Sequence, residues 1–435
     1  MIQAKEYKEY IESHMLESKE SALKTTMTIQ NSELNAGGPN YTRTLQIPKF
    51  FTQEDKQNFN EIVQMTYGIF TKVIHAYRKD EKVRSLFGFS KELEELIVLK
   101  PRYASMIPIC RVDIFYNEQT KDFHFCEFNT DGTSAMNENK RLHEFLKWNN
   151  VYTHFQEDYE EMELVESWAD TFLDICASDQ KLPKDFRIGI VDFLDKAYLS
   201  ELYVFEKVFQ ARNIPCEVID IRKLEYREGK LYSKVTKQPI DVIYRRAVTR
   251  DIMEQYDQVS DFIQAVKDDA VCLIGAFQTQ LVHHKEISKV LVSSTMQAYF
   301  DQEEIEFIEK HLPATYDLDE SIKTKVLENK DQWIVKPKDS YASKGVWAGV
   351  DLSEDRWQEV VEHSMNQDYI VQTYITPYQT ENIDLVNYDT FQQYSNLTGL
   401  YVYDGKFAGV YSRLSDSGII STQYNEKTIP TLFIK

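Results

Sequence analysis

Apolar residues recur at helical spacing in two segments of the first hundred residues, 3–22 and 54–79. Pro39 and Pro48 lie between these segments and predict a break in the helical pattern. A third stretch, 139–177, shows the same spacing and is rich in aromatic residues. We expect its core positions to be Trp148, Phe155, Tyr159, Trp168 and Phe172.

Two short apolar and aromatic runs, IFY and HFCEF, stand on either side of the turn-forming NEQTKD. In a strand, residues two apart share a face, so Arg111 lies beside Asp113, and Glu127 beside Asn129. Pairing the runs gathers three oxygen ligands suited to Mg²⁺, with Arg111 placed to meet a phosphate or carboxylate. A polar loop, TDGTSAMNEN, follows. The alternative is a hairpin whose charges simply face solvent.

The pattern changes between residues 185 and 280, where continuous apolar runs alternate with amphipathic helices at 199–213 and 251–267. The runs are RIGIVDF, CEVIDI, IDVIYRR and AVCLIGAF. This alternation predicts an open α/β domain with parallel strands, and such sheets bind ligands beyond the carboxyl ends of their strands. Arg245 and Arg246 stand at one such end and are candidates for holding an acidic substrate group, unless they are ordinary surface arginines.

The last third begins with QTQLVHHKEISKVL, at a predicted helix start. The adjacent residues His283 and His284 cannot present both rings on one helix face, which argues against a metal site. A buried lysine in this segment, Lys285 or Lys289, can reach a nucleotide phosphate.

WIVKPKDSYASKGVWAG reads as strand, polar loop and strand, which predicts a flap. Lys336 stands at its root, and the backbone N–H groups from Ser343 to Gly345 can approach phosphate oxygens. An ordinary hairpin with a solvated tip fits the same pattern. A helix at 354–366 and the strand DYIVQTYI follow, and a final hairpin delivers Arg413 into a loop.

Composition narrows the class of protein. The 435 residues suffice for two or three domains, and the net charge of −20 disfavours a binder of nucleic acid or of anionic membranes. The five cysteines are scattered, and the first residues lack an apolar signal core. No run reaches the ~18 apolar residues that span a bilayer, so we expect a cytoplasmic protein that binds neither membrane nor nucleic acid. Neither GxxxxGK[ST] nor GxGxxG occurs.

Taken together, the motifs resemble an ATP-grasp ligase, in which two α+β lobes clamp ATP. VKPKDSYASKG resembles the flap of that fold, and YIVQTYI resembles the strand that leads to the adenine-binding hinge. Here the RxD and ExN motifs precede the lysines by more than 150 residues. That order resembles the circularly permuted branch, typified by the glutathionylspermidine synthase family, over roughly residues 100–435.

The resemblance assigns roles to the candidate residues. It implies that Asp113, Glu127 and Asn129 hold Mg²⁺, and that Arg111 and Arg413 lie near the transferred phosphate. It favours Lys285 over Lys289 as the first nucleotide lysine. It also implies that the nucleotide-binding residues are Lys285, Lys336, Ser343, Gly345 and Gln372. Two departures stand out: the flap is poorer in glycine than usual, and these residues show no sign of the Cys-dependent amidase domain that some family members carry upstream.

We therefore expect a mixed α+β and α/β fold of the circularly permuted ATP-grasp type. The expected divisions are an N-terminal helical region at 1–100, a metal-binding part of the core at 101–184, a pre-ATP-grasp-like α/β substrate domain at 185–280 and a nucleotide-binding lobe at 281–435.

The expected activity joins a small-molecule carboxylate to an amine through an acyl-phosphate, with ATP and Mg²⁺, in the manner of glutathionylspermidine synthase. A peptide, an amino acid or a polyamine are all candidate substrates. A catalytically inactive scaffold protein and a small-molecule kinase are the alternatives.

Overall fold

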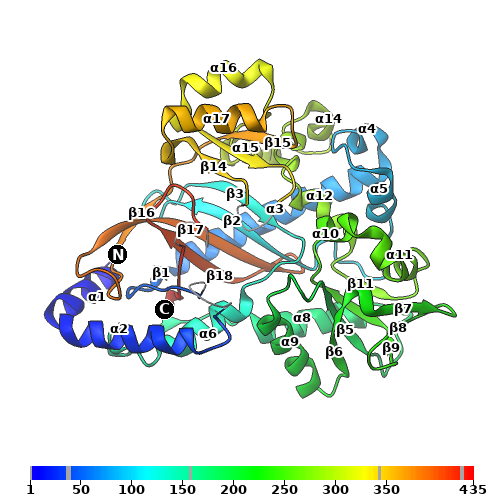
Figure 1. Cartoon of the computed structure of the whole chain (residues 1–435), viewed down its shortest axis with the longest axis horizontal. Helices are drawn as coiled ribbons and strands as arrows, with labels where there is room; N and C mark the ends of the chain where they lie inside the picture. The colour runs from blue at the N-terminus through cyan, green and yellow to red at the C-terminus, as the bar shows by residue number, and fades with distance from the viewer. Residues whose placement is uncertain (1, 36–40, 156–158, 341–343, 422–425) are drawn as a thin grey trace.

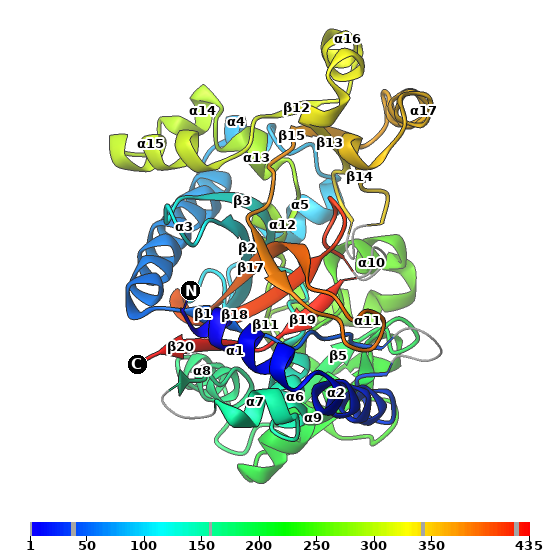
Figure 2. The ribbon, with the colours of Figure 1, turned by 90° about the vertical axis from the view of Figure 1, so that its left-hand side faces the viewer.

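The computed structural model describes the whole chain except residues 1, 36–40, 156–158, 341–343 and 422–425. At its centre lies a sheet of six strands in the order β19-β18-β17-β2-β3, with β16 paired to β17 (Figures 1 and 2). We call it the central sheet. Its strands are β2 (Ile109–Tyr116), β3 (Phe123–Asn129), β16 (Gln379–Asn382), β17 (Gln392–Tyr403), β18 (Lys406–Ser415) and β19 (Lys427–Ile429).

The predicted hairpin of β2 and β3 is confirmed. Its strands pair antiparallel, with Asp113 opposite Glu127 and Arg111 opposite Asn129. The turn passes through Lys121, whose φ of 62° lies in the left-handed region. Strand β17 pairs with the other edge of β2, so Asp113 lies on an interior strand, whereas Glu127 and Asn129 lie on the edge strand β3.

A small lobe stands above the central sheet in Figure 1. Its antiparallel sheet has the order β12-β15-β13-β14 and is covered by two helices. Trp333, Val335 and Val371 of this sheet pack with Trp357 of the second helix. The elements are β12 (Thr315–Asp317), α16 (Glu320–Glu328), β13 (Trp333–Pro337), β14 (Trp347–Ala348), α17 (Glu354–Ser364) and β15 (Tyr369–Thr373). The predicted strands around the flap are thus present, whereas Ser343 lies outside the described residues.

The predicted open α/β unit is present at the lower right of Figure 1, with parallel strands in the order β11-β10-β5-β6. Helices pack on both faces, because Phe172 and Phe205 bury against one face, and Phe262 lies in the core on the other. The helix predicted at 251–267 is interrupted by a 3₁₀ turn, Tyr256–Val259. The elements are α8 (Val165–Ala177), β5 (Ile188–Asp192), α9 (Leu199–Ala211), β6 (Cys216–Asp220), β10 (Val242–Arg245), α10 (Thr249–Glu254), α11 (Ser260–Lys267) and β11 (Cys272–Ile274).

The helix predicted at 54–79 is confirmed as α3 (Gln53–Lys79), which packs along the central sheet. The helical segment predicted at 3–22 is two helices, α1 (Ile2–Ser13) and α2 (Met15–Gln30). A small sheet not predicted from the sequence joins both ends of the chain, because β1 (Lys49–Phe51) pairs in parallel with β20 (Thr431–Ile434). Strand β20 also pairs with β4 (Tyr159–Glu160).

The remaining elements connect these units. They are α4 (Glu81–Arg84), α5 (Lys91–Ile97), α6 (Met136–Leu146), α7 (Asn150–His154), β7 (Leu224–Arg227), β8 (Lys230–Ser233), β9 (Pro239–Ile240), α12 (Gln280–His283), α13 (Ile287–Val290), α14 (Ser294–Gln297) and α15 (Gln302–His311).

One predicted core residue is wrong: Trp148 is 84% exposed, because it follows the end of α6 at the surface, whereas Trp168 and Phe172 are fully buried. No helix of the described residues is long and apolar enough to cross a membrane.

Candidate active site

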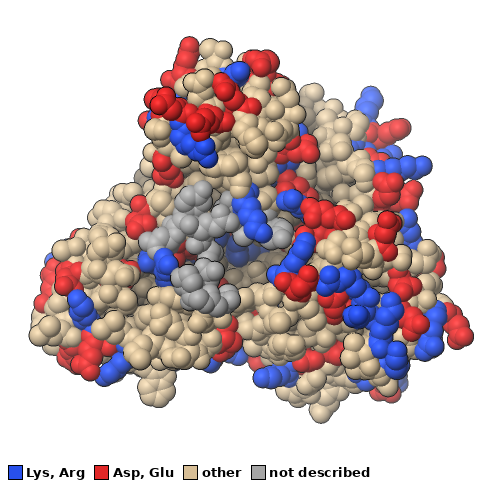
Figure 3. Space-filling model, viewed as in Figure 1, with Lys and Arg blue, Asp and Glu red and all other residues tan. Residues whose placement is uncertain are grey.

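A cavity opens between the central sheet and the small lobe. Lys285, Lys336 and Gln372 line it together with the apolar side chains of Ile334, Val346 and Ile419. On the face shown in Figure 3 the surface is hollowed below the small lobe, and Lys and Arg side chains gather at the hollow. An apolar wall with a few cationic groups suits a nucleotide, whose base is flat and whose phosphates are charged. We call this the upper cavity.

Lys336 reaches the upper cavity from β13. Its Nζ donates to Gln372 Oε1 at 2.9 Å and to the carbonyl oxygen of Cys126 at 3.4 Å. Gln372, on the adjacent strand β15, donates in turn to Thr315 Oγ1 at 2.9 Å. The chain of hydrogen bonds fixes the ammonium group of Lys336 at the boundary between the two sheets.

Lys285 enters the same cavity from the segment between α12 and α13. Its Nζ donates to the carbonyl oxygen of Ser340 at 3.0 Å, and its backbone N–H donates to the carbonyl of Lys338 at 2.9 Å. Burial lowers the pKa of Lys285, and the opposing attraction of Glu127 does not reverse the shift. Lys289 lies elsewhere, with its Nζ 2.6 Å from both Glu286 and Asp317.

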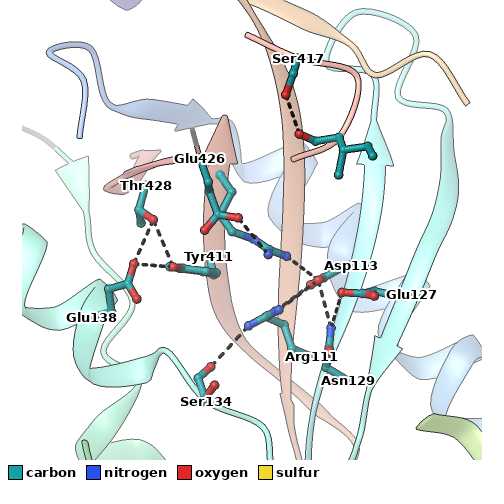
Figure 4. Close-up of polar contacts among 12 residues, drawn as sticks. Arg111, Asp113, Glu127, Asn129, Ser134, Glu138, Tyr411, Ser417, Glu426 and Thr428 are labelled. Carbon is teal, nitrogen blue, oxygen red and sulfur yellow. Dashed lines mark hydrogen bonds and ion pairs between the residues drawn. The ribbon is translucent and has the colours of Figure 1, made fainter. Parts of the chain in front are cut away.

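Asp113 is completely buried and carries several partners (Figure 4). Arg111 contacts both of its carboxylate oxygens, with Nε at 2.7 Å and Nη2 at 3.0 Å. Arg413 of β18 also donates to it, and Asn129 Nδ2 donates at 3.0 Å. Gly399 faces the pair from β17, where a Cβ would stand 2.8 Å from both Arg111 Cδ and Asp113 Oδ1.

Glu127 lies near the lysines of the upper cavity and also near the arginines that contact Asp113. Burial opposes its charged form, but the positive charges of Lys285, Arg413 and Lys336 outweigh burial and lower its pKa to about 2. Glu127 is therefore ionised across the working pH range. It lines the upper cavity and also a second cavity on the other side, so one carboxylate borders both.

The three predicted Mg²⁺ ligands adjoin one another through Asn129, whose Nδ2 donates to Asp113 at 3.0 Å and to Glu127 at 3.4 Å. Within the described ranges no group of three or more His, Cys, Asp or Glu side chains could hold a metal ion. Two carboxylates with an amide suit Mg²⁺, which completes its coordination with water and substrate phosphates.

The second cavity, of about 300 Å³, lies beyond Arg111 and Arg413, and we call it the lower cavity. Sequence reasoning missed four of its residues: Glu138, Tyr411, Ser421 and Glu426. Tyr411 precedes Arg413 by two positions on β18, so the period of a strand could have placed both on one face. The two acids give no local sequence signal, because they come from α6 and from a segment almost 300 residues later.

Arg245 and Arg246 do not line the lower cavity, although both lie at the carboxyl end of β10, as predicted. Arg245 forms a buried ion pair with Asp131 at 2.5 Å, and Arg246 pairs with Glu201 at 2.8 Å. Asp131 also accepts from the backbone N–H of Thr249. The pairing of Arg245 with Asp131 favours positioning of the 130–135 loop over direct contact with a substrate. Arg246 Nε and Nη1 have no hydrogen-bond partner among the described residues.

Residues 154–399 match the family model of the circularly permuted ATP-grasp type 2 proteins. The chain belongs to this family. Among solved structures, an apo glutathione synthetase-like effector, GSS30 from Globodera pallida, superposes with a TM-score of 0.63 at 12% identity, over 96% of this chain and 97% of its own. A putative gamma-glutamylcysteine synthetase from Methylobacillus flagellatus KT gives a TM-score of 0.37 at 9% identity, over 88% and 89%. No curated protein matches the sequence.

The predicted circularly permuted ATP-grasp fold is thus confirmed. Family membership supports an ATP-dependent ligase in general, and ATP-grasp proteins generally use ATP with Mg²⁺. The narrower resemblance to glutathionylspermidine synthase stays a prediction, as do the site roles and domain divisions expected from the sequence.

Proposed function

We propose that the protein is an ATP-dependent carboxylate–amine ligase, similar to glutathionylspermidine synthase, that forms an amide through an acyl-phosphate. The observation that carries the proposal is the position of Glu127. It borders a cavity with two lysines on one side and a cavity with two arginines on the other. This arrangement suits transfer of a phosphoryl group from a nucleotide in the upper cavity to a carboxylate in the lower cavity.

The roles follow from the charges in each cavity. Lys285 and Lys336 would neutralise the phosphates, and Gln372 would hold Lys336 in place. Asp113, Glu127 and Asn129 would hold Mg²⁺, and the ion would supply positive charge to offset that of the phosphates. Gly345, at the end of the flap, has a φ of 72°, a backbone conformation that favours glycine.

Arg111 and Arg413 would stabilise the transferring group. Both guanidinium groups already point at Asp113, so they are oriented before a substrate arrives (Figure 4). Preorganised charge of this kind accounts for much of the rate enhancement in phosphoryl and acyl transfer. An amine would then attack the acyl carbon, and inorganic phosphate would leave.

The deciding experiment measures ADP release with MgATP against a panel of carboxylates, each with and without a pool of amines, followed by mass analysis. A ligase gives ADP that requires both partners and a product equal to their summed mass less water. A kinase gives a stable phosphorylated product without an amine. A scaffold protein without a nucleotide site gives neither turnover nor thermal stabilisation by MgATP.

The metal assignment has a separate test. E127Q should lower the rate of ADP release by about two orders of magnitude. E144Q is the matched control, since Glu144 lies on α6 at the surface and pairs with Arg141. Unimpaired turnover by E127Q would remove Glu127 from the site.

A further inference from the structure

The lower cavity has walls of opposite charge. Arg111 and Arg413 form one end, beside the metal-ligand candidates, and Glu138 and Glu426 line the same cavity. The arginines suit the reacting carboxylate. The proposed reaction gives Glu138 and Glu426 no role. The cavity is large enough for a small organic molecule that bears both kinds of charge.

Glu138 is held in a fixed orientation by the central sheet. Its Oε1 accepts from Tyr411 Oη at 2.6 Å and from Thr428 Oγ1 at 3.0 Å (Figure 4). Within the part of the chain that the structure describes, its other oxygen has no hydrogen-bond partner. A carboxylate clamped through one oxygen and open at the other is an acceptor that still has room for a donor.

Two further groups point to a ligand at this place. Ser421 is 4% exposed, lines the cavity, and its Oγ has no hydrogen-bond partner among the described residues. Buried hydroxyls are normally paired, because an unpaired one costs free energy. Among the described residues, the carboxylate of Glu426 has one long contact, to Arg413 at 3.5 Å.

The electrostatics favour a cationic donor. Burial raises the pKa of Glu138, and the hydrogen bond from Tyr411 offsets this only in part. Burial likewise raises the pKa of Glu426. A cation between the two acids would offset the cost of burying their charges, whereas an anion there would add to it.

We propose that Glu138, with Ser421 and Glu426, forms a subsite for a primary ammonium group of the substrate. An ammonium group has three N–H donors and no acceptor, which matches two carboxylates and one hydroxyl. The inference rests on the proposed function insofar as the ligand is a ligase substrate. The ammonium group belongs either to the amine co-substrate or to an amino-acid-like carboxylate substrate.

Paired probes test the subsite without knowledge of the natural substrate. Each pair shares a skeleton and differs in the ammonium group: 1,4-diaminobutane against 1,4-butanediol, and L-glutamate against glutarate. Binding is measured by titration calorimetry with the full chain, with and without the Mg²⁺ complex of a non-hydrolysable ATP analogue. We expect the ammonium-bearing member of one pair to bind ~10-fold to ~100-fold more tightly, the range for a hydrogen bond to a charged group.

E138Q should abolish that preference while it keeps an oxygen to accept from Tyr411 and Thr428. E144Q, on the same helix but outside the cavity, should preserve it. S421A is a second variant, and it should weaken the preference several-fold without loss of thermal stability, since Ser421 Oγ has no hydrogen-bond partner among the described residues to lose.

The pair that discriminates identifies the source of the ammonium group. A preference absent from wild type, or one that survives in both E138Q and S421A, would overturn the subsite. Failure of the nucleotide analogue to bind would count against the proposed ligase, but it would leave the ammonium preference measurable by itself.

Discussion

At the scale of single residues, two lysines four positions apart have opposite surroundings. Lys285 faces the upper cavity, whereas the charge of Lys289 is neutralised by Glu286 and Asp317. We therefore predict that K285M weakens MgATP binding by ~10-fold to ~100-fold, because a charge-assisted contact to phosphate is lost. K289M should change the affinity by less than ~3-fold. Titration calorimetry measures both, and equal losses would contradict the assignment of Lys285.

Site residues could be predicted from the sequence where their spacing along a strand places them on one face. Arg111, Asp113, Glu127 and Asn129 follow the period of two neighbouring strands, so their convergence could be deduced before the structure was known. Glu138 could not be found in this way, since its partners Tyr411 and Thr428 are more than 270 residues away. Contacts between distant segments depend on topology, which a single sequence does not reveal.

At the scale of elements, the approach of β17 to β2 depends on Gly399. A Cβ at this position would stand 2.8 Å from Arg111 Cδ and from Asp113 Oδ1, closer than side chains pack. We predict that G399A displaces this ion pair, lowers stability by ~1–3 kcal/mol and reduces turnover. Gly68 is the control, because nothing lies within 4 Å of an added Cβ there and alanine favours its helix α3.

Chemical denaturation and ADP-release assays of G399A and G68A test this prediction. G68A should be at least as stable as wild type and equally active. If G399A matched G68A in both measurements, the close approach of β17 to β2 would not matter for the site.

The start of α3 predicts a dependence of stability on pH. Burial disfavours the charge of Asp55, but hydrogen bonds from Lys121, Tyr116 and Thr52 outweigh it and lower its pKa. A lowered carboxyl pKa stabilises the fold above the unfolded value of ~4, and the contribution is lost as the pH falls through the folded pKa. D55N should therefore lower the free energy of unfolding by ~2 kcal/mol at pH 7 and by much less near pH 3.

Denaturant unfolding at the two pH values checks this, with E54Q as the control on the same helical turn, where Glu54 is exposed. If D55N lowered the free energy of unfolding equally at pH 7 and pH 3, the charge of Asp55 would not be the cause of the stabilisation.

The elements that the sequence failed to predict are those with weak periodicity. Strands β1 and β4 have three and two residues, too few to show an alternation. The helix predicted at 251–267 has a continuous polar and apolar pattern, but the backbone tightens into a 3₁₀ turn at Tyr256–Val259. Segments such as α3 and α17 were predicted well because their periodicity extends over several turns.

At the scale of the whole molecule, the 130–135 loop connects the central sheet to the α/β unit. Thr130 Oγ1 donates to the carbonyl of Thr279, and Gly132 packs so closely that a Cβ would stand 2.7 Å from the carbonyl oxygen of Arg246. With a φ of 64°, Gly132 also has a backbone conformation that favours glycine. The 130–135 loop, which follows the metal-ligand candidates of β3, is thus held against the α/β unit.

The ion pair of Arg245 and Asp131 connects the same two units and is deeply buried, since the side chains are 1% and 0% exposed. Removing one partner leaves the other charge buried without compensation, so R245M should lower the free energy of unfolding by ~3–5 kcal/mol. R227A, at a side chain that is 54% exposed, should change it by less than ~0.5 kcal/mol. The double variant R245M/D131N should be more stable than R245M, because the uncompensated charge is gone. If instead R245M unfolded at the same denaturant concentration as R227A, the ion pair would not couple the α/β unit to the site, and Arg245 would return as a candidate for substrate binding.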